Sequence, residues 1–169
     1  MSLALGSVAG IGAARVASSH YSVIVRDSAQ MMIAGPALED LASLGDVSKE
    51  ELGSYKIHTR NGAIDDEAAS EQEAFAMARQ FLSYLPSSAD ELPPLQDCSD
   101  DPNRTDDALI NLVPKDPRQV YKMHTLLESV CDAGSFFEMG RKWGRSIITG
   151  LARFGGIPVA IFAENPRVY

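Results

Sequence analysis

The feature that most constrains the fold is the stretch at residues 2–15, where an apolar strand runs into a turn of small residues and then into a helix. We expect the strand over residues 2–9 and the helix over residues 11–19, joined at Gly10. This order is typical of an α/β protein with a buried sheet. Because the start of a helix leaves backbone N–H groups unpaired, the turn is also a place where a negatively charged oxygen can bind.

Other local signals predict strands and helices along the rest of the chain. The last two predicted strands form a hairpin, and because both arms are largely apolar we expect both faces to be buried. The predicted elements are strands at 21–25 and 30–33, a short helix at 37–44, a helical turn opened by a capping box at 48–51, a strand or extended arm at 56–59, a long helix at 70–84, a helix at 121–131 and hairpin arms at 146–153 and 157–163.

The composition changes after residue 86, where prolines and aspartates interrupt the chain. We interpret this stretch as a linker or an extended surface arm. The predicted organisation is therefore a first domain at 1–86, a linker at 87–120 and a second domain at 121–169. The acidic pairs at 65–66 and 100–101 are expected to be solvated charge.

The charge and the cysteines exclude several classes of function. A net charge of -8 argues against a nucleic-acid or anionic-membrane surface. No apolar run reaches the roughly 20 residues that cross a bilayer, and the N-terminus lacks a basic region and a cleavage site, so a cytoplasmic protein is expected. Cys98 and Cys131 fit no metal-ligand spacing, so we expect idle thiols in a reducing compartment and no metal site.

The turn at 10–12 is the main candidate for chemistry, because backbone donors stabilise a developing oxyanion without reorganising. The alternative is a tight turn that binds nothing. The turn lacks the third glycine and the acidic residue of a dinucleotide fingerprint. Ser7 does not stand at a strand-to-helix elbow, so it is not expected to be a nucleophile.

The remaining polar candidates favour structural roles. His20, His58 and His124 share no ligand spacing and are expected to be solvent-facing or hydrogen-bonded within the fold. The basic cluster at 141–145 is interpreted as a surface face, with a phosphate or an acidic partner as the alternative.

The sequence resembles the carboxyltransferase (beta) subunit of biotin-dependent acyl-CoA carboxylases. The order and spacing of the matching motifs agree across nearly the whole chain. These motifs are residues 6–13, 21–27, 31–36, 50–53, 58–59 and 81–86 in the first half, and 110–114, 116–118, 132–138, 149–153 and 158–159 in the second.

The resemblance implies a crotonase-like fold of ββα units, with parts of two repeats joined by the acidic, proline-rich bridge. It implies that acyl-CoA binds the first domain, that carboxybiotin arrives on a biotin carboxyl carrier or biotin carboxylase partner, and that the full-length subunit is a homo-oligomer. By position, Gly10 and Ile11 match the pair whose backbone N–H groups form the oxyanion hole for the enolate. Gly12 and Ala13 then lie in the vicinity of the acyl-CoA.

This chain departs from the family's pattern at several positions, and the departures change what is expected of the site. The family usually has a second glycine where this chain has Ile11, a tyrosine at Ala14 and a proline at Val16, so the acyl pocket is expected to differ. The family's subunits are much longer, and their second oxyanion hole falls beyond Tyr169. The chain is therefore expected to be a central segment, located in the cytoplasm or, in a eukaryote, in the mitochondrial matrix.

Two alternatives remain open from the sequence. One is another crotonase-fold acyl-CoA enzyme, such as a hydratase, an isomerase or a decarboxylase, which would keep the enolate hole and add an acid or base. The other is a non-catalytic remnant that acts only in oligomer contacts.

Overall fold

The computed structural model describes residues 1–35, 48–101, 103–116 and 118–168. The short helix predicted at 37–44 lies outside them. Two compact units make up the chain. The first unit combines Met1–Ala78 with Gly140–Gly144, and the second combines Arg79–Met139 with Arg145–Tyr169.

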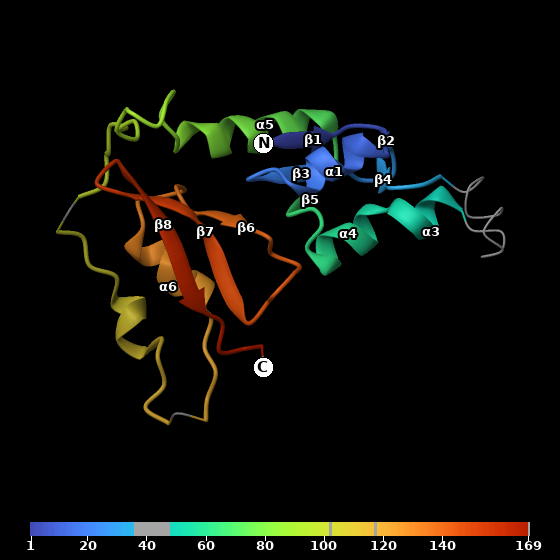
Figure 1. The fold of residues 1–169 in the computed structure, drawn as a ribbon. Coiled ribbons are helices and arrows are strands. Elements are labelled where there is room, and N and C mark those ends of the chain that lie inside the picture. The colour runs from blue at the N-terminus through green and yellow to red at the C-terminus, as the bar shows by residue number, and fades with distance from the viewer. Residues whose placement is uncertain (36–47, 102, 117, 169) are drawn as a thin grey trace. The chain divides into compact units, whose positions relative to one another are not determined.

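Parallel strands form the centre of the first unit (Figure 1). The single strand predicted over 2–9 is in fact two strands that belong to different sheets. Strand β3 is buried along its whole length, as the apolar sequence of a parallel sheet requires. One sheet has the order β1-β3-β5 and the other pairs β2 with β4. The strands are β1 (Ser2–Ala4), β2 (Ser7–Ala9), β3 (Ser22–Val25), β4 (Gln30–Met32) and β5 (Asp66–Ala68).

Four helices accompany these strands within the described residues, and three of them were predicted. The capping box is confirmed, since the Ser48 hydroxyl accepts from the Glu51 N–H and the Glu51 carboxylate accepts from the Ser48 N–H. The strand predicted at 56–59 is wrong, because that segment is helical and ends at Gly62, which has a left-handed φ of 80°. The helices are α1 (Ile11–Ala17), α3 (Lys49–Gly53), α4 (Tyr55–Asn61) and α5 (Glu71–Ser83), the last of which continues into the second unit.

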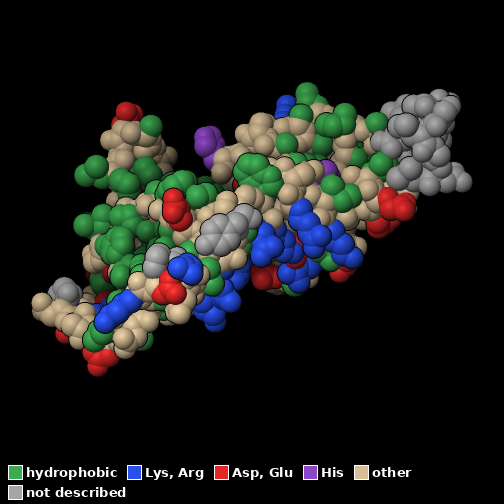
Figure 2. Space-filling view, turned by 90° about the horizontal axis from the view of Figure 1, so that it is seen from below, with side chains coloured by type: hydrophobic (Ala, Val, Ile, Leu, Met, Phe, Trp, Pro, Cys, Tyr) green, Lys and Arg blue, Asp and Glu red, His purple; other side chains and the backbone are tan. Residues whose placement is uncertain are grey.

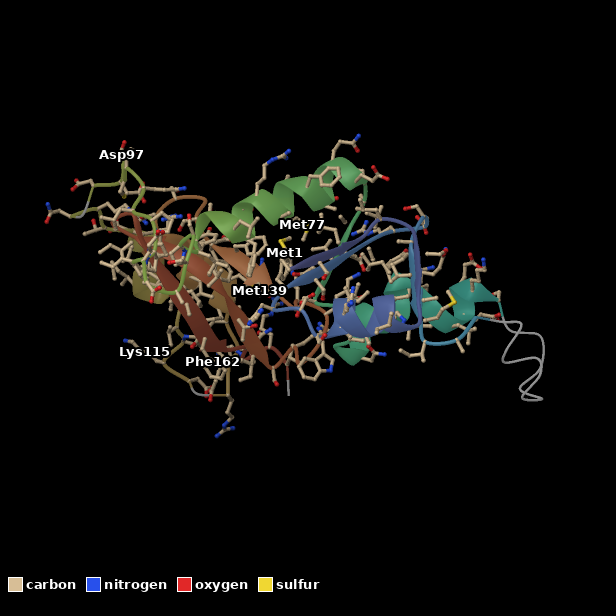
Figure 3. All side chains as sticks on the ribbon, turned by 45° about the horizontal axis from the view of Figure 1, so that its top comes forward. Met1, Met77, Asp97, Lys115, Met139 and Phe162 are labelled. Atoms are coloured by element: carbon tan, nitrogen blue, oxygen red, sulfur yellow. The ribbon has the colours of Figure 1, made fainter. Side chains whose placement is uncertain are left out.

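An antiparallel sheet of order β6-β7-β8 forms the centre of the second unit, with α6 packed beside it (Figure 1). The predicted hairpin is confirmed, and Gly155 and Gly156 make its turn with φ of 58° and 81°. The expectation that both its faces are buried is wrong, because burial alternates along β8 and Phe162 is 76% exposed (Figure 3). The elements are the 3-10 helix η1 (Asp107–Asn111), α6 (Met123–Val130), β6 (Phe137–Met139), β7 (Ile147–Phe154) and β8 (Ile157–Glu164).

The proline-rich segment at 87–120, which holds Asp97 and Lys115 (Figure 3), belongs to the second unit. It is mostly exposed, as expected of a surface arm. Hydrogen bonds nevertheless fasten it, because the Gln96 N–H donates to the Gly156 carbonyl at 3.1 Å. The Ser129 hydroxyl of α6 also donates to Asp106 at 2.6 Å. The segment is thus a packed arm of its unit.

Candidate functional site

Gly10 makes the turn between β2 and α1, and its backbone requires glycine. Its φ of 60° and ψ of -130° fall in a region that side chains with a Cβ rarely adopt. The Gly10 N–H donates to the carbonyls of Met32 and Ile33 at 3.1 and 3.2 Å, which extends the pairing of β2 with β4. The Gly10 N–H is therefore already bonded within the fold. Of the predicted pair of donors, Gly10 shapes the turn and Ile11 keeps an available N–H.

The next three amides stand at the open start of α1. The first intrahelical bond of the helix runs from the Ala14 N–H to the Gly10 carbonyl at 3.3 Å. No side chain caps the helix, and its first turn has no acidic residue. Within the described part of the chain, the N–H groups of Ile11, Gly12 and Ala13 have no acceptor. The predicted backbone site at this turn stays a prediction, now with Ile11 as its first available donor.

Exposed aliphatic side chains lie beside the turn. The side chains of Ile11 and Ile33 are 75% and 72% exposed, and the Ile33 carbonyl accepts from the Gly10 N–H, so both residues lie at the turn. A Cβ on Gly12 would lie 3.2 Å from Val8 Cγ1, so only a very small residue fits there easily. The site therefore offers backbone donors next to exposed apolar groups.

The three histidines do not come together in a common site. His58 contacts the Met31 carbonyl at 2.6 Å, His124 contacts the Glu138 carboxylate at 3.0 Å, and His20 is exposed. For His58 and His124 this is the hydrogen-bonded role expected from the sequence. Ser7 donates its hydroxyl to the Gln30 side chain at 2.7 Å, and no histidine takes part in that contact.

Two acids that were expected to be solvated are instead bound inside the first unit, so that expectation is wrong for residues 65–66. Asp65 accepts from the Ser22 N–H and hydroxyl at 2.8 and 2.9 Å. Asp66 accepts from the Tyr21 hydroxyl at 3.1 Å and from the Gly140 N–H at 3.3 Å. Burial raises the pKa of Asp66 to about 6. Because β5 pairs with β3, the sheet partly buries these acids, and no local signal reveals such pairing.

Basic side chains gather on the face of the molecule in Figure 2. Within the first unit, Glu67 pairs with Arg26 at 2.7 Å and with Lys142 at 2.6 Å. Lys142 also lies 6.0 Å from the centre of the Tyr55 ring. Lys142, which belongs to the basic cluster at 141–145, thus binds the segment Gly140–Gly144 to the rest of the first unit.

A cavity of about 240 Å³ lies in the second unit. Its buried Arg153 donates to the carbonyls of Ser83, Pro94 and Gly156. Other lining residues are Cys98, Asp100 and Asp132, which have ligand atoms within 4.8 Å of one another.

These groups already have partners in the fold. Asp132 accepts from the N–H groups of Gly155 and Gly156 at 2.8 and 2.7 Å. Burial would raise the pKa of Asp132, but these amides hold it below its usual range. Asp100 accepts from the Ala133 N–H at 2.8 Å and lies 3.5 Å from the Arg104 guanidinium. The two carboxylates thus serve the hairpin turn and its neighbours.

The first unit thus combines parallel ββα elements with a glycine turn, and comparison with known proteins identifies the family to which such a chain belongs. The whole chain, residues 1–169, matches the carboxyl transferase domain, so the chain belongs to that family. The resemblance and the crotonase-like fold expected from the sequence are confirmed. None of the described helices is long and apolar enough to span a membrane.

Several relatives are similar over almost the whole chain. The propionyl-CoA carboxylase beta chain of Roseobacter denitrificans is 34% identical over 99% of this chain and 33% of its own length. The methylmalonyl-CoA decarboxylase subunit alpha of Veillonella parvula is 32% identical over the same shares. The transcarboxylase 12S hexamer, solved with hydrolysed methylmalonyl-coenzyme A bound, superposes with a TM-score of 0.90 at 25% identity and covers 98% of this chain and 33% of that one. The chain thus spans about a third of the length of these relatives.

Proposed function

We propose that this chain is part of the carboxyltransferase component of an acyl-CoA carboxylase, which transfers CO2 to the α-carbon of an acyl-CoA. The supporting observation is the row of unpaired backbone amides that starts at Ile11, beside the exposed side chains of Ile11 and Ile33. The family and the relatives named for propionyl-CoA carboxylase support the same reaction.

In this proposal the backbone of the turn stabilises the enolate. Loss of the α-proton places negative charge on the thioester oxygen, and the Ile11 N–H donates to that oxygen. Gly12 and Ala13 lie next to the acyl-CoA, where their small size lets the thioester approach the backbone. Carboxybiotin on a carrier protein would supply the CO2 that bonds to the α-carbon, and the ureido nitrogen anion left when the CO2 departs would take the α-proton. No residue of this chain is assigned to the biotin group.

The organisation proposed for the longer protein follows the same family. Residues 1–86 belong to the acyl-CoA-binding domain and residues 121–169 to the second carboxyltransferase domain, with 87–120 between them. The partners are acyl-CoA, a biotin carboxyl carrier or biotin carboxylase subunit, and further copies of the same chain. The proposed location is the cytoplasm, or the mitochondrial matrix in a eukaryote.

A pair of variants tests the backbone donor. Ile11→Pro removes the N–H at the first position of the helix, where proline is well tolerated. Ile11→Ala keeps the N–H and removes only the side chain. We expect calorimetric titration with propionyl-CoA to show binding by the wild type and by Ile11→Ala, and binding at least tenfold weaker by Ile11→Pro, about the loss of one hydrogen bond to a polar ligand.

Two outcomes of this titration would contradict the proposal. No binding of propionyl-CoA by the wild type would favour the non-catalytic alternative. Equal affinity of the proline and alanine variants would remove the Ile11 amide from the site. Coenzyme A without the acyl group serves as the control for contacts outside the thioester.

A further inference from the structure

His58 lies on α4 and caps a carbonyl of β4. Its Nε2 is 2.6 Å from the Met31 carbonyl oxygen. A carbonyl only accepts hydrogen bonds, so Nε2 carries a proton and donates. The Nδ1 atom is buried and has no partner among the described residues. The contact with Met31 thus fixes a proton on Nε2.

The capped carbonyl faces away from the partner strand of β4. In a parallel pair, alternate residues of one strand bond to the neighbouring strand. Met32 bonds toward β2, because its carbonyl accepts from the Gly10 N–H. The carbonyl of Met31, one residue earlier, therefore points to the opposite edge, where His58 pairs with it. Without such a partner this nearly buried strand would hold an unsatisfied carbonyl.

Helix α3, which precedes α4 in the chain, also packs closely against Met31. A Cβ on Gly53 would lie 2.5 Å from the Met31 carbonyl oxygen and 3.0 Å from the Met31 nitrogen, so only glycine allows this approach. The Gln30 side chain adds a contact to Glu50 at 3.4 Å. Helices α3 and α4 thus hold β4 on the edge that β2 leaves free.

The anchored carbonyl of Met31 directly precedes the two carbonyls whose bonds shape the turn. The carbonyls of Met32 and Ile33 both accept from the Gly10 N–H. Any shift of β4 along or away from β2 therefore moves Gly10, and with it the direction of the Ile11 amide.

We propose that His58 is a positioning residue for the backbone site at Gly10–Ile11, which it controls through Met31 and β4 without contacting the acyl-CoA. The inference rests on the proposed function for its catalytic meaning. The structural link from His58 to Gly10 stands independently of any ligand.

Two substitutions of His58 distinguish the effect of its hydrogen-bond donor from the effect of its imidazole ring. His58→Gln places its amide nitrogen about where Nε2 lies and keeps the donor, whereas His58→Asn reaches only the position of Nδ1 and loses it. We expect hydrogen–deuterium exchange of the Gly10 amide, followed by NMR in the ligand-free chain, to be about tenfold faster in His58→Asn and near wild type in His58→Gln. The Ala152 amide in the second unit is the internal control and is expected to be unchanged.

The same samples distinguish this inference from the proposed function. Titration with propionyl-CoA should show affinity lowered several-fold in His58→Asn and restored in His58→Gln. If the wild type binds no acyl-CoA but Gly10 responds as expected, the proposed function fails and the link from His58 to the turn holds. If the Gly10 amide exchanges at the wild-type rate in His58→Asn, the inference is overturned.

A measurement on the wild type covers the case in which His58→Asn does not fold. Nitrogen–proton correlation NMR of the imidazole identifies which ring nitrogen carries the proton. We expect the proton of His58 on Nε2. A proton found on Nδ1 instead would refute the bond to Met31 and with it the inference.

Discussion

Replacing Gly10 by alanine is the most direct test of the turn that organises the first unit. With φ at 60° and ψ at -130°, Gly10 adopts a backbone conformation that costs a residue with a Cβ about 1–3 kcal/mol. A Cβ at this position would meet no atom within 4 Å, so the cost comes from the backbone and not from a clash. We therefore expect Gly10→Ala to lower the free energy of unfolding by about 1–3 kcal/mol.

Gly6 provides a matched control a few residues earlier in the chain. A Cβ there would also meet nothing within 4 Å, but its φ is not positive. Alanine at such a position restricts the unfolded chain and is expected to stabilise by about 0.4–1 kcal/mol. The two substitutions thus have the same chemistry and opposite expected signs.

Urea unfolding followed by tryptophan fluorescence measures the effect in the appropriate unit. Trp143 is the single tryptophan of the chain, and it belongs to the first unit together with Gly10. With a urea dependence of about 1–3 kcal/mol per M, the two variants are expected to differ in midpoint by about 1 M. Equal midpoints for Gly10→Ala and Gly6→Ala would refute the assignment of strain to Gly10.

Two further substitutions test buried charges. Burial raises the pKa of Asp66 from 3.8 to about 6, so this carboxyl contributes stability that is present below pH 4 and is lost as the pH rises through 6, by at most about 3 kcal/mol. Asp66→Asn is expected to remove this decline of the unfolding free energy, measured by urea unfolding from pH 4 to 8. An unchanged decline in the variant would contradict the assignment to Asp66. Arg153→Lys leaves backbone carbonyls in the second unit without donors and is expected to lower the free energy of unfolding by about 2–4 kcal/mol. Urea unfolding followed by circular dichroism measures this loss. A loss below about 0.5 kcal/mol, the usual limit for a surface substitution, would count against the role of these hydrogen bonds.

Local sequence signals predicted the elements whose stability is itself local. The capping box at Ser48 and the Gly155–Gly156 turn each depend on residues within a few positions, and both are present. Helix α5 has the expected bounds because its apolar spacing extends over several turns. Such features are readable because the groups that satisfy one another are neighbours in the chain.

The errors arose where distant residues decide the outcome. The segment at 56–59 was predicted to be a strand, yet it forms α4, whose His58 reaches Met31, 27 residues earlier. The burial of Asp66 depends on β5 joining β3 and on Gly140, 74 residues later. No pattern within either segment contains this information, and tertiary contacts override local preference there.

The candidate site shows the same division between local and distant information. The position of the turn could be predicted because strand, small residues and helix follow one another. The state of its amides could not, because the partner of the Gly10 N–H is supplied by β4 some twenty residues later. The role of His58 was hidden for the same reason, since its partner is a backbone carbonyl and leaves no trace in the residue type of Met31.

The proposed site of backbone amides places different demands on the side chains at positions 10 and 11. Replacing glycine by another residue at position 11 keeps the N–H, because every residue except proline carries one. Ile11 is part of a helix, so its φ places no demand for glycine. Gly10 is different, since its φ is positive and its amide is already bonded to β4. The adjacent positions therefore obey opposite constraints: position 10 requires glycine for its shape, and position 11 requires only an amide proton.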